Sequence, residues 1–190
     1  GGSIRIPSHF CGVFGHKPTY GVVPPDGHAL PGQIVPKDIA VVGPLARSAG
    51  DLALALELTA GASARDAAAW SVRLPPAIHD KLSQFRVAIV TSHPTAEVDE
   101  SVQAPLRELG EFLARQGAKV SFEARPEFDF EEAHRLYVLM LRAETGWSID
   151  DATFEKQLAR AADLAEDDRG YEAMMLRAHT LRHREWAWLN

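Results

Sequence analysis

The chain begins with Gly1-Gly2-Ser3, the residues whose types and spacing most clearly suggest catalytic chemistry. Two adjacent glycines can form a tight turn whose backbone N–H groups converge, because glycine adopts dihedral angles that other residues avoid. Converging donors of this kind stabilise the oxyanion of a tetrahedral intermediate beside a nucleophilic serine. The same three residues also occur as a plain turn or a linker, so the motif alone leaves both interpretations open.

Two longer segments of the sequence favour the catalytic interpretation of this motif. Residues 4–21 read Ile-Arg-Ile-Pro-Ser-His-Phe-Cys-Gly-Val-Phe-Gly-His-Lys-Pro-Thr-Tyr-Gly, and residues 42–48 read Val-Gly-Pro-Leu-Ala-Arg-Ser, followed by Asp-Leu-Ala at 51–53. These segments are similar to the second half of the signature of the amidase signature family, a family of serine hydrolases. The resemblance covers residues 1–61 strongly and is weaker from Arg86 onward.

The resemblance implies a Ser-Ser-Lys triad, in which a lysine and a bridging serine relay the proton of the nucleophile. On this alignment the nucleophile is Ser3, and the backbone N–H groups of Gly1, Gly2 and Ser3 form much of the oxyanion hole. The family needs no cofactor and no metal. Its lysine and bridging serine lie upstream of the nucleophile, in stretches this chain does not contain. A serine hydroxyl is a poor nucleophile without a base, so we expect the isolated chain to be inactive.

Two further residues are candidates for substrate binding. Arg5 follows the nucleophile turn and either binds loop carbonyl groups, the interpretation we favour, or faces a substrate carboxylate. His16 lies within the family segment and is the second candidate for substrate contact. Lys17 belongs to the Lys-Pro-Thr turn and Lys37 has no motif around it, so neither is expected to replace the missing base.

Other sites are less consistent with the sequence. A Ser-His-Asp hydrolase with His9 or His16 as base conflicts with the position of both histidines inside the family segment. His179 and His183 have the four-residue spacing of two metal ligands on a helix, but no third ligand accompanies them, so we predict no metal. Cys11 is expected to pack in the core beneath the active-site loop.

The first 47 residues, rich in proline and glycine, are predicted to form loops and short extended segments. Ser48 then precedes an apolar run from Asp51 to Ala60, with an acid three positions on, and Gly61 follows as a stop. This pattern predicts a short helix, and its apolar side chains on nearly all sides predict that it is buried.

Residues 86–90 and 119–122 have the length and composition of strands. Between them, apolar residues recur on one helical face and Gly117 supplies a stop. A strand-helix-strand unit of this kind makes a right-handed crossover between parallel strands in nearly all cases, which predicts an α/β fold. Further helices are expected over residues 131–143, 151–165 and 171–189. The residues of the helical face are Val102, Leu106, Leu109, Phe112 and Leu113.

We therefore expect one partial amidase domain over residues 1–190. Residues 1–61 carry the nucleophile loop and the rest of the signature, residues 62–84 are a connection, and residues 85–190 hold the strand-helix-strand unit and covering helices. The family resemblance implies that these elements belong to a mixed β-sheet flanked by helices on both faces.

Composition limits the partners. The 190 residues carry a net charge of −6, which gives no electrostatic reason to expect nucleic acid or an anionic membrane. One cysteine excludes an internal disulfide and favours a cytoplasmic setting. The chain lacks an initiator Met and stops within a helical pattern, so we expect N-terminal and C-terminal parts of the same protein to be missing. The expected ligand is a small-molecule amide, and a homo-oligomer is compatible with the sequence.

Two alternatives to a stand-alone amidase remain. One is the A subunit of a tRNA-dependent amidotransferase, a family member that works in a complex, although residues 22–38 favour the stand-alone enzyme. The other is a non-catalytic interaction fragment. The sequence upstream of Gly1 would distinguish these interpretations, because a lysine and a bridging serine there would support an enzyme over an interaction fragment.

Overall fold

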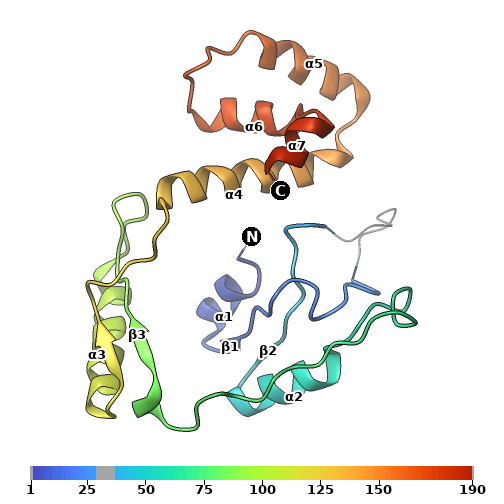
Figure 1. Cartoon of the computed structure of the whole chain (residues 1–190). Coiled ribbons are helices and arrows are strands. Elements are labelled where there is room, and N and C mark those ends of the chain that lie inside the picture. Colours follow the sequence, from blue (N-terminus) through green and yellow to red (C-terminus); the bar gives the residue numbers. More distant parts are fainter. Residues whose placement is uncertain (1, 29–36, 190) are drawn as a thin grey trace. The chain divides into compact units, whose positions relative to one another are not determined.

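The computed structural model describes residues 2–28 and 37–189, which form two compact units (Figure 1). The first unit comprises residues 1–74 and 138–190, and the second comprises residues 75–137. The class is α/β, as predicted, and the strands form two separate pairs in the described part of the chain. No helix among the described residues is long and apolar enough to cross a membrane.

The first unit begins with a helix that the sequence did not suggest. Helix α1 spans Arg5–Cys11 and ends at Gly12, whose φ of 63° lies in the left-handed region that favours glycine. Strand β1 (Phe14–Gly15) then pairs antiparallel with β2 (Leu45–Ala46). The prediction that residues 1–47 contain only loops and extended segments is therefore wrong at α1. The local sequence conceals this helix because it is short and has Pro7 in its first turn.

Helix α2 follows at Ala49–Thr59, capped as predicted. The Ser48 hydroxyl oxygen accepts a hydrogen bond of 3.0 Å from the backbone N–H of Asp51, and the helix ends shortly before Gly61. The predicted burial is wrong, because no residue of α2 is buried in this chain and Leu58 is 76% exposed. The apolar faces of α2 thus lack cover from the described residues.

The second unit contains the predicted crossover. Strand β3 (Arg86–Ala88) follows a short 3-10 helix, η1 (Leu82–Gln84), and pairs in parallel with β4 (Lys119–Ser121). Helix α3 (Glu100–Arg115) connects the two strands and begins at Asp99, whose carboxylate accepts a hydrogen bond from the N–H of Ser101. The prediction of neighbouring parallel strands joined by a helix is confirmed.

Helix α3 packs closely against the residues that directly follow the two strands. A Cβ atom added to Gly110 would lie 2.6 Å from Cζ of Phe122 and 2.7 Å from Cδ1 of Ile89. Only a glycine lets the helix backbone come this near. Gly117 ends the helix with a φ of 88°, as its position predicted. The prediction of a fully buried strand was too strong, since Arg86 is exposed and burial is confined to Ile89.

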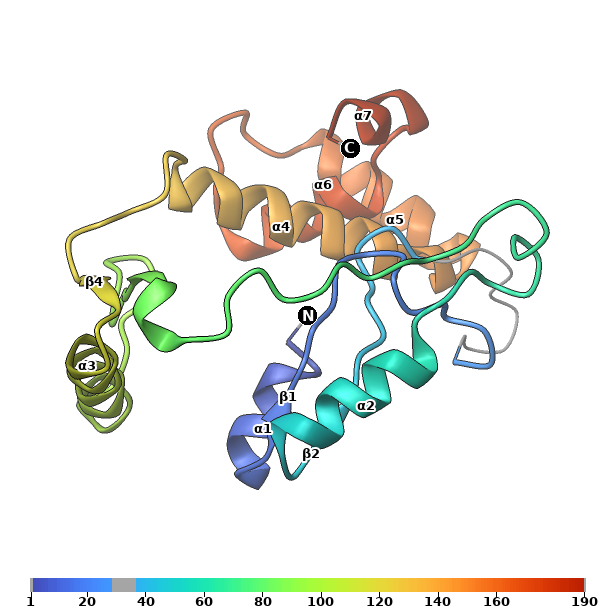
Figure 2. The ribbon, with the colours of Figure 1, turned by 60° about the horizontal axis from the view of Figure 1, so that its bottom comes forward.

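The remaining helices are α4 (Phe130–Thr145), α5 (Asp151–Ala162), α6 (Tyr171–His179) and α7 (His183–Leu189), with a 3-10 helix, η2 (Gly146–Ser148), after α4. Helices α5 and α6 lie side by side in both views (Figure 1 and Figure 2). Among the described residues, the most deeply buried apolar residues lie on α6, and they are Ala173, Leu176 and Ala178.

A break separates α6 from α7, where the sequence predicted one continuous helix. The Thr180 hydroxyl donates to the carbonyl of Leu176 at 2.8 Å and closes α6. The carboxylate of Glu185 then accepts a hydrogen bond of 2.9 Å from the backbone N–H of Arg182, which starts α7. A glutamate at the third helical position often binds the N-cap N–H in this way.

Candidate active site

The turn around Ser3 requires glycine at position 2. Gly2 has a φ of 106°, a conformation that L side chains rarely adopt, and a Cβ atom there would lie 2.6 Å from Cδ1 of Ile6. The carbonyl of Gly2 accepts a hydrogen bond of 2.7 Å from the N–H of Ile6, which ties the turn to the start of α1. Gly1, the other predicted oxyanion donor, lies outside the described residues.

Ser3 is exposed directly after this turn. Its hydroxyl makes no hydrogen bond to any part of the chain that the structure describes, and it is therefore open to a base and a substrate from outside. A serine needs such a base to become a nucleophile at neutral pH.

Ser8 fixes the backbone after Ser3. Its side-chain hydroxyl donates to the carbonyl of Ile4 at 2.7 Å, and its backbone N–H donates to the same oxygen at 3.2 Å. Ser8 is only 6% exposed, and no other polar residue in the described part of the chain is buried. Both hydrogen bonds restrain the peptide group one residue beyond Ser3.

The strand pair β1–β2 supports this helix. The N–H of His16 donates to the carbonyl of Pro44 at 3.0 Å and extends the pairing by one step. Gly43 and Gly15 lie where the two strands approach Ile4 and Ser8, and a Cβ atom at either glycine would overlap a neighbour. The sequence did not indicate the structural roles of Ser8, Gly15 and Gly43, because their contacts join segments that lie far apart in the chain.

Arg5 and His16, the predicted substrate contacts, lie in this same region. Arg5 is exposed on α1, and its side chain forms no hydrogen bond or ion pair with the described residues, so it binds no loop carbonyl there. His16 is half-buried and its backbone pairs with β2. Among the described residues, no partner fixes the role of either side chain.

The two lysines that were set aside as bases have other contacts. Lys17 Nζ donates to the carbonyl of Pro18 at 3.2 Å, within its own turn. Lys37 Nζ lies 5.7 Å from the centre of the Trp147 ring, a cation–π distance. Burial raises the pKa of the nearby Glu144 carboxyl, and the charge of Lys37 opposes that rise. Both lysines therefore have local roles.

The other candidate residues, Cys11, His179 and His183, do not form part of a catalytic or metal site among the described residues. Cys11 is exposed at the end of α1, so the prediction that it packs in the core is wrong. His179 closes α6 and its Nδ1 lies 2.8 Å from Oε1 of Gln157, while His183 begins α7, so the two histidines do not share a helix. Within residues 2–28 and 37–189, no group of three His, Cys, Asp or Glu side chains could hold a metal.

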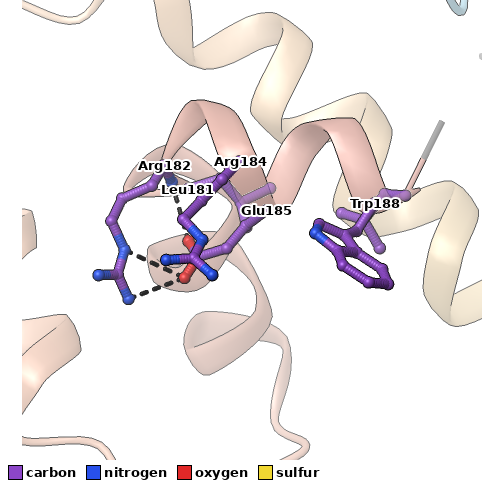
Figure 3. A pocket seen from close by; sticks show the side chains of 6 residues that line it. Leu181, Arg182, Arg184, Glu185 and Trp188 are labelled. Carbon is purple, nitrogen blue, oxygen red and sulfur yellow. Dashed lines mark hydrogen bonds and ion pairs between the residues drawn. The ribbon is translucent and has the colours of Figure 1, made fainter.

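An open hollow of about 470 Å³ lies along α7 (Figure 3). The Arg182 guanidinium forms an ion pair with Glu185 at 2.9 Å across one side, and Trp188 borders the other side. The hydrogen bond from the Arg182 backbone N–H holds the pKa of the Glu185 carboxyl below its usual range. Arg182 and Glu185 are thus paired with each other at this hollow.

Comparison with known proteins identifies the class. A sequence model of the family described as Amidase matches residues 1–182, and the chain belongs to this family. No solved structure matches the chain.

Curated relatives show which members it resembles. The chain is 32% identical to the A subunit of glutamyl-tRNA(Gln) amidotransferase of Lachnoclostridium phytofermentans over 169 residues, which cover 86% of this chain and 32% of that protein. It is 36% identical to the indoleacetamide hydrolase of Bradyrhizobium japonicum over 131 residues, which cover 68% of this chain and 28% of that protein. The chain spans about a third of the length of the curated relatives it matches.

Proposed function

We propose that this chain is the nucleophile-bearing segment of an amidase that cleaves a carboxylic amide through an acyl-enzyme on Ser3. The observation that carries the proposal is the exposed Ser3 hydroxyl at the end of a turn that only Gly2 can form, in a chain of the Amidase family. The reaction needs a base to take the hydroxyl proton, and the family supplies it from a lysine and a bridging serine.

In this mechanism Ser3 Oγ attacks the amide carbonyl and its proton passes through the bridging serine and the lysine to the leaving nitrogen. Backbone N–H groups of the turn at Gly1, Gly2 and Ser3 stabilise the oxyanion, a contribution of about 3 kcal/mol for one donor. Water then releases the acid from Ser3. Arg5 and His16 are our proposals for substrate contacts, because Arg5 follows the nucleophile turn and His16 lies within the family segment.

The partners follow from the same proposal. The Lys and the bridging Ser would come from N-terminal parts of the same protein, and further parts would cover the exposed faces of α2. We propose a cytoplasmic enzyme with a small-molecule amide substrate and no cofactor, and a homo-oligomer remains compatible. The negative charge of the chain supports the absence of nucleic-acid and membrane partners.

The test is Ser3→Ala in the full-length protein, with Ser71→Ala as the matched control, since Ser71 is exposed in a loop. We expect Ser3→Ala to abolish amide turnover and labelling by a fluorophosphonate probe, with the thermal transition nearly unchanged. Ser71→Ala should keep both. Turnover retained in Ser3→Ala would show that the nucleophile lies elsewhere.

The isolated chain gives the complementary result. Without the lysine it should show no turnover and little labelling of Ser3, because losing triad members costs on the order of a millionfold in turnover. Stoichiometric labelling of the isolated chain, lost in Ser3→Ala, would contradict the need for an upstream base. It would also argue against a non-catalytic interaction fragment.

A second candidate is the A subunit of a tRNA-dependent amidotransferase, favoured by the names of several relatives. The two functions differ in their need for partner proteins. A full-length protein that hydrolyses free amides alone, with indoleacetamide and glutamine among those offered, supports the stand-alone amidase. Residues 22–38 favour the stand-alone enzyme by their sequence, and residues 29–36 among them lie outside the described residues.

A further inference from the structure

The side chain of Ile4, the residue after Ser3, enters a space that two glycines leave open. A Cβ atom at Gly15 would lie 3.1 Å from Cγ2 of Ile4, and one at Gly43 would lie 2.9 Å from Cδ1 of Ile4. Both distances are shorter than an ordinary carbon–carbon contact of about 3.5–4.0 Å. The branched side chain of Ile4 therefore fits only because neither position carries a side chain.

Gly15 also borders the hydroxyl that binds the backbone of Ile4. A Cβ atom there would lie 2.2 Å from Oγ of Ser8, whose hydrogen bond to the Ile4 carbonyl measures 2.7 Å. The absence of a side chain at Gly15 thus leaves room both for the Ile4 side chain and for the Ser8 hydroxyl that binds the Ile4 carbonyl. A methyl group at this position would displace both contacts together.

Gly43 makes the same region tighter from the other strand. A Cβ atom there would lie 2.2 Å from the carbonyl oxygen of His16 and 2.8 Å from Cδ of Pro18. The first of these atoms belongs to the backbone and cannot move aside alone. Substitution of Gly43 would therefore disturb folding, which makes Gly15 the better position for a test.

We propose that Gly15 is a positioning residue for Ser3, acting through Ser8 and Ile4. The proposal rests on the function proposed for Ser3. Ile4 is bonded directly to Ser3, so a shift of its carbonyl or its side chain rotates the peptide that carries the Ser3 Cα. A misplacement of about 1 Å at a reacting group can lower the rate about a hundredfold.

The experiment uses the full-length protein with Gly15→Ala, Ser8→Ala and the double variant. For Gly15→Ala we expect kcat and the rate of fluorophosphonate labelling to fall by about tenfold or more, with KM nearly unchanged. Ser8→Ala alone removes one of two hydrogen bonds to Ile4 and should cost much less. The double variant removes the oxygen that the new methyl would strike, so it should recover most of the labelling rate lost in Gly15→Ala.

Gly61→Ala is the matched control, because a Cβ atom at Gly61 meets nothing within 4 Å, and it should keep the parent rates. The thermal transition of each variant shows whether the folded fraction differs. A parent labelling rate in Gly15→Ala would overturn the positioning role, and so would a loss that Ser8→Ala does not relieve. Turnover retained in Ser3→Ala is a separate result, which refutes the nucleophile itself.

Discussion

Replacement of Gly110 by alanine tests the packing of α3 against β3 and β4. The added methyl carbon would lie 2.6 Å from Cζ of Phe122 and 2.7 Å from Cδ1 of Ile89. Phe122 is 38% exposed and can turn outward, whereas Ile89 is 8% exposed and has little room to move. The contact with Ile89 therefore decides the sign of the effect.

The magnitude follows from two opposing contributions. Alanine in place of glycine within a helix stabilises by about 1 kcal/mol. An extra methyl in a packed site costs about 1–3 kcal/mol. We expect a net loss of about 1 kcal/mol, which corresponds to about fivefold in an opening equilibrium.

Amide hydrogen exchange of β3 and β4, followed by mass spectrometry under native conditions, measures that equilibrium. Exchange should be about fivefold faster in Gly110→Ala. In a background of Ile89→Val, which lacks the obstructing Cδ1, the same substitution should add little further. Slower exchange in the single variant would refute the packing argument, because it would show that the space beside Gly110 is open.

Three further predictions concern α2, α6 and the exposed faces. Ser48→Ala should destabilise α2 by about 1 kcal/mol through loss of its N-cap, seen as faster amide exchange in α2 alone; unchanged exchange there would mean the cap contributes nothing. Burial, and secondarily the charge of Arg142, lower the pKa of His179 below its ordinary 6.5. The unfolded chain therefore binds the proton more readily, and stability should fall as the pH drops below 6.5, with no effect well above it. Thermal transitions across this range should show a weaker dependence in His179→Asn, and an equal dependence would contradict the assignment. The isolated chain should self-associate and bind a hydrophobic dye, because side chains such as Phe10 are 82% exposed. Size-exclusion chromatography with light scattering that shows a dye-free monomer would oppose this, and co-expression with the upstream segment should relieve it.

The crossover in the second unit was predictable because its signals are local. The apolar period of α3, the β-branched run at β3 and the stop at Gly117 each lie within a few residues of the structure they specify. The Ser48 cap is local as well, since its partner is three residues away. Such features depend little on what else surrounds the segment.

Features that depend on distant residues were not predictable. Helix α1 is held by Ser8, which lies against Gly15, whereas residues 5–11 contain no sequence pattern that predicts a helix. The exposure of Cys11 and of α2 reflects which surfaces this chain covers, a property that composition does not encode. The break before α7 depended on a single glutamate at the third helical position, without the Ser or Thr that usually accompanies it.

The candidate site divides in the same way. The conformational need for glycine at position 2 follows from the Gly-Gly-Ser pattern, and the structure gives Gly2 a φ of 106°. The nucleophile role proposed for Ser3 came from family resemblance, because the residues next to a serine do not reveal which base activates its hydroxyl. The supporting contacts of Ile4 join three segments that are separate in the sequence and meet only in the folded chain.

The exposed thiol at the end of α1 offers a practical route to watching this region. Cys11 is the single cysteine of the chain and lies on the helix that begins directly after the Ser3 turn. A maleimide-linked fluorophore or spin label would therefore attach at one place within these 190 residues without any substitution. Its signal would report motion of α1 as an inhibitor occupies Ser3.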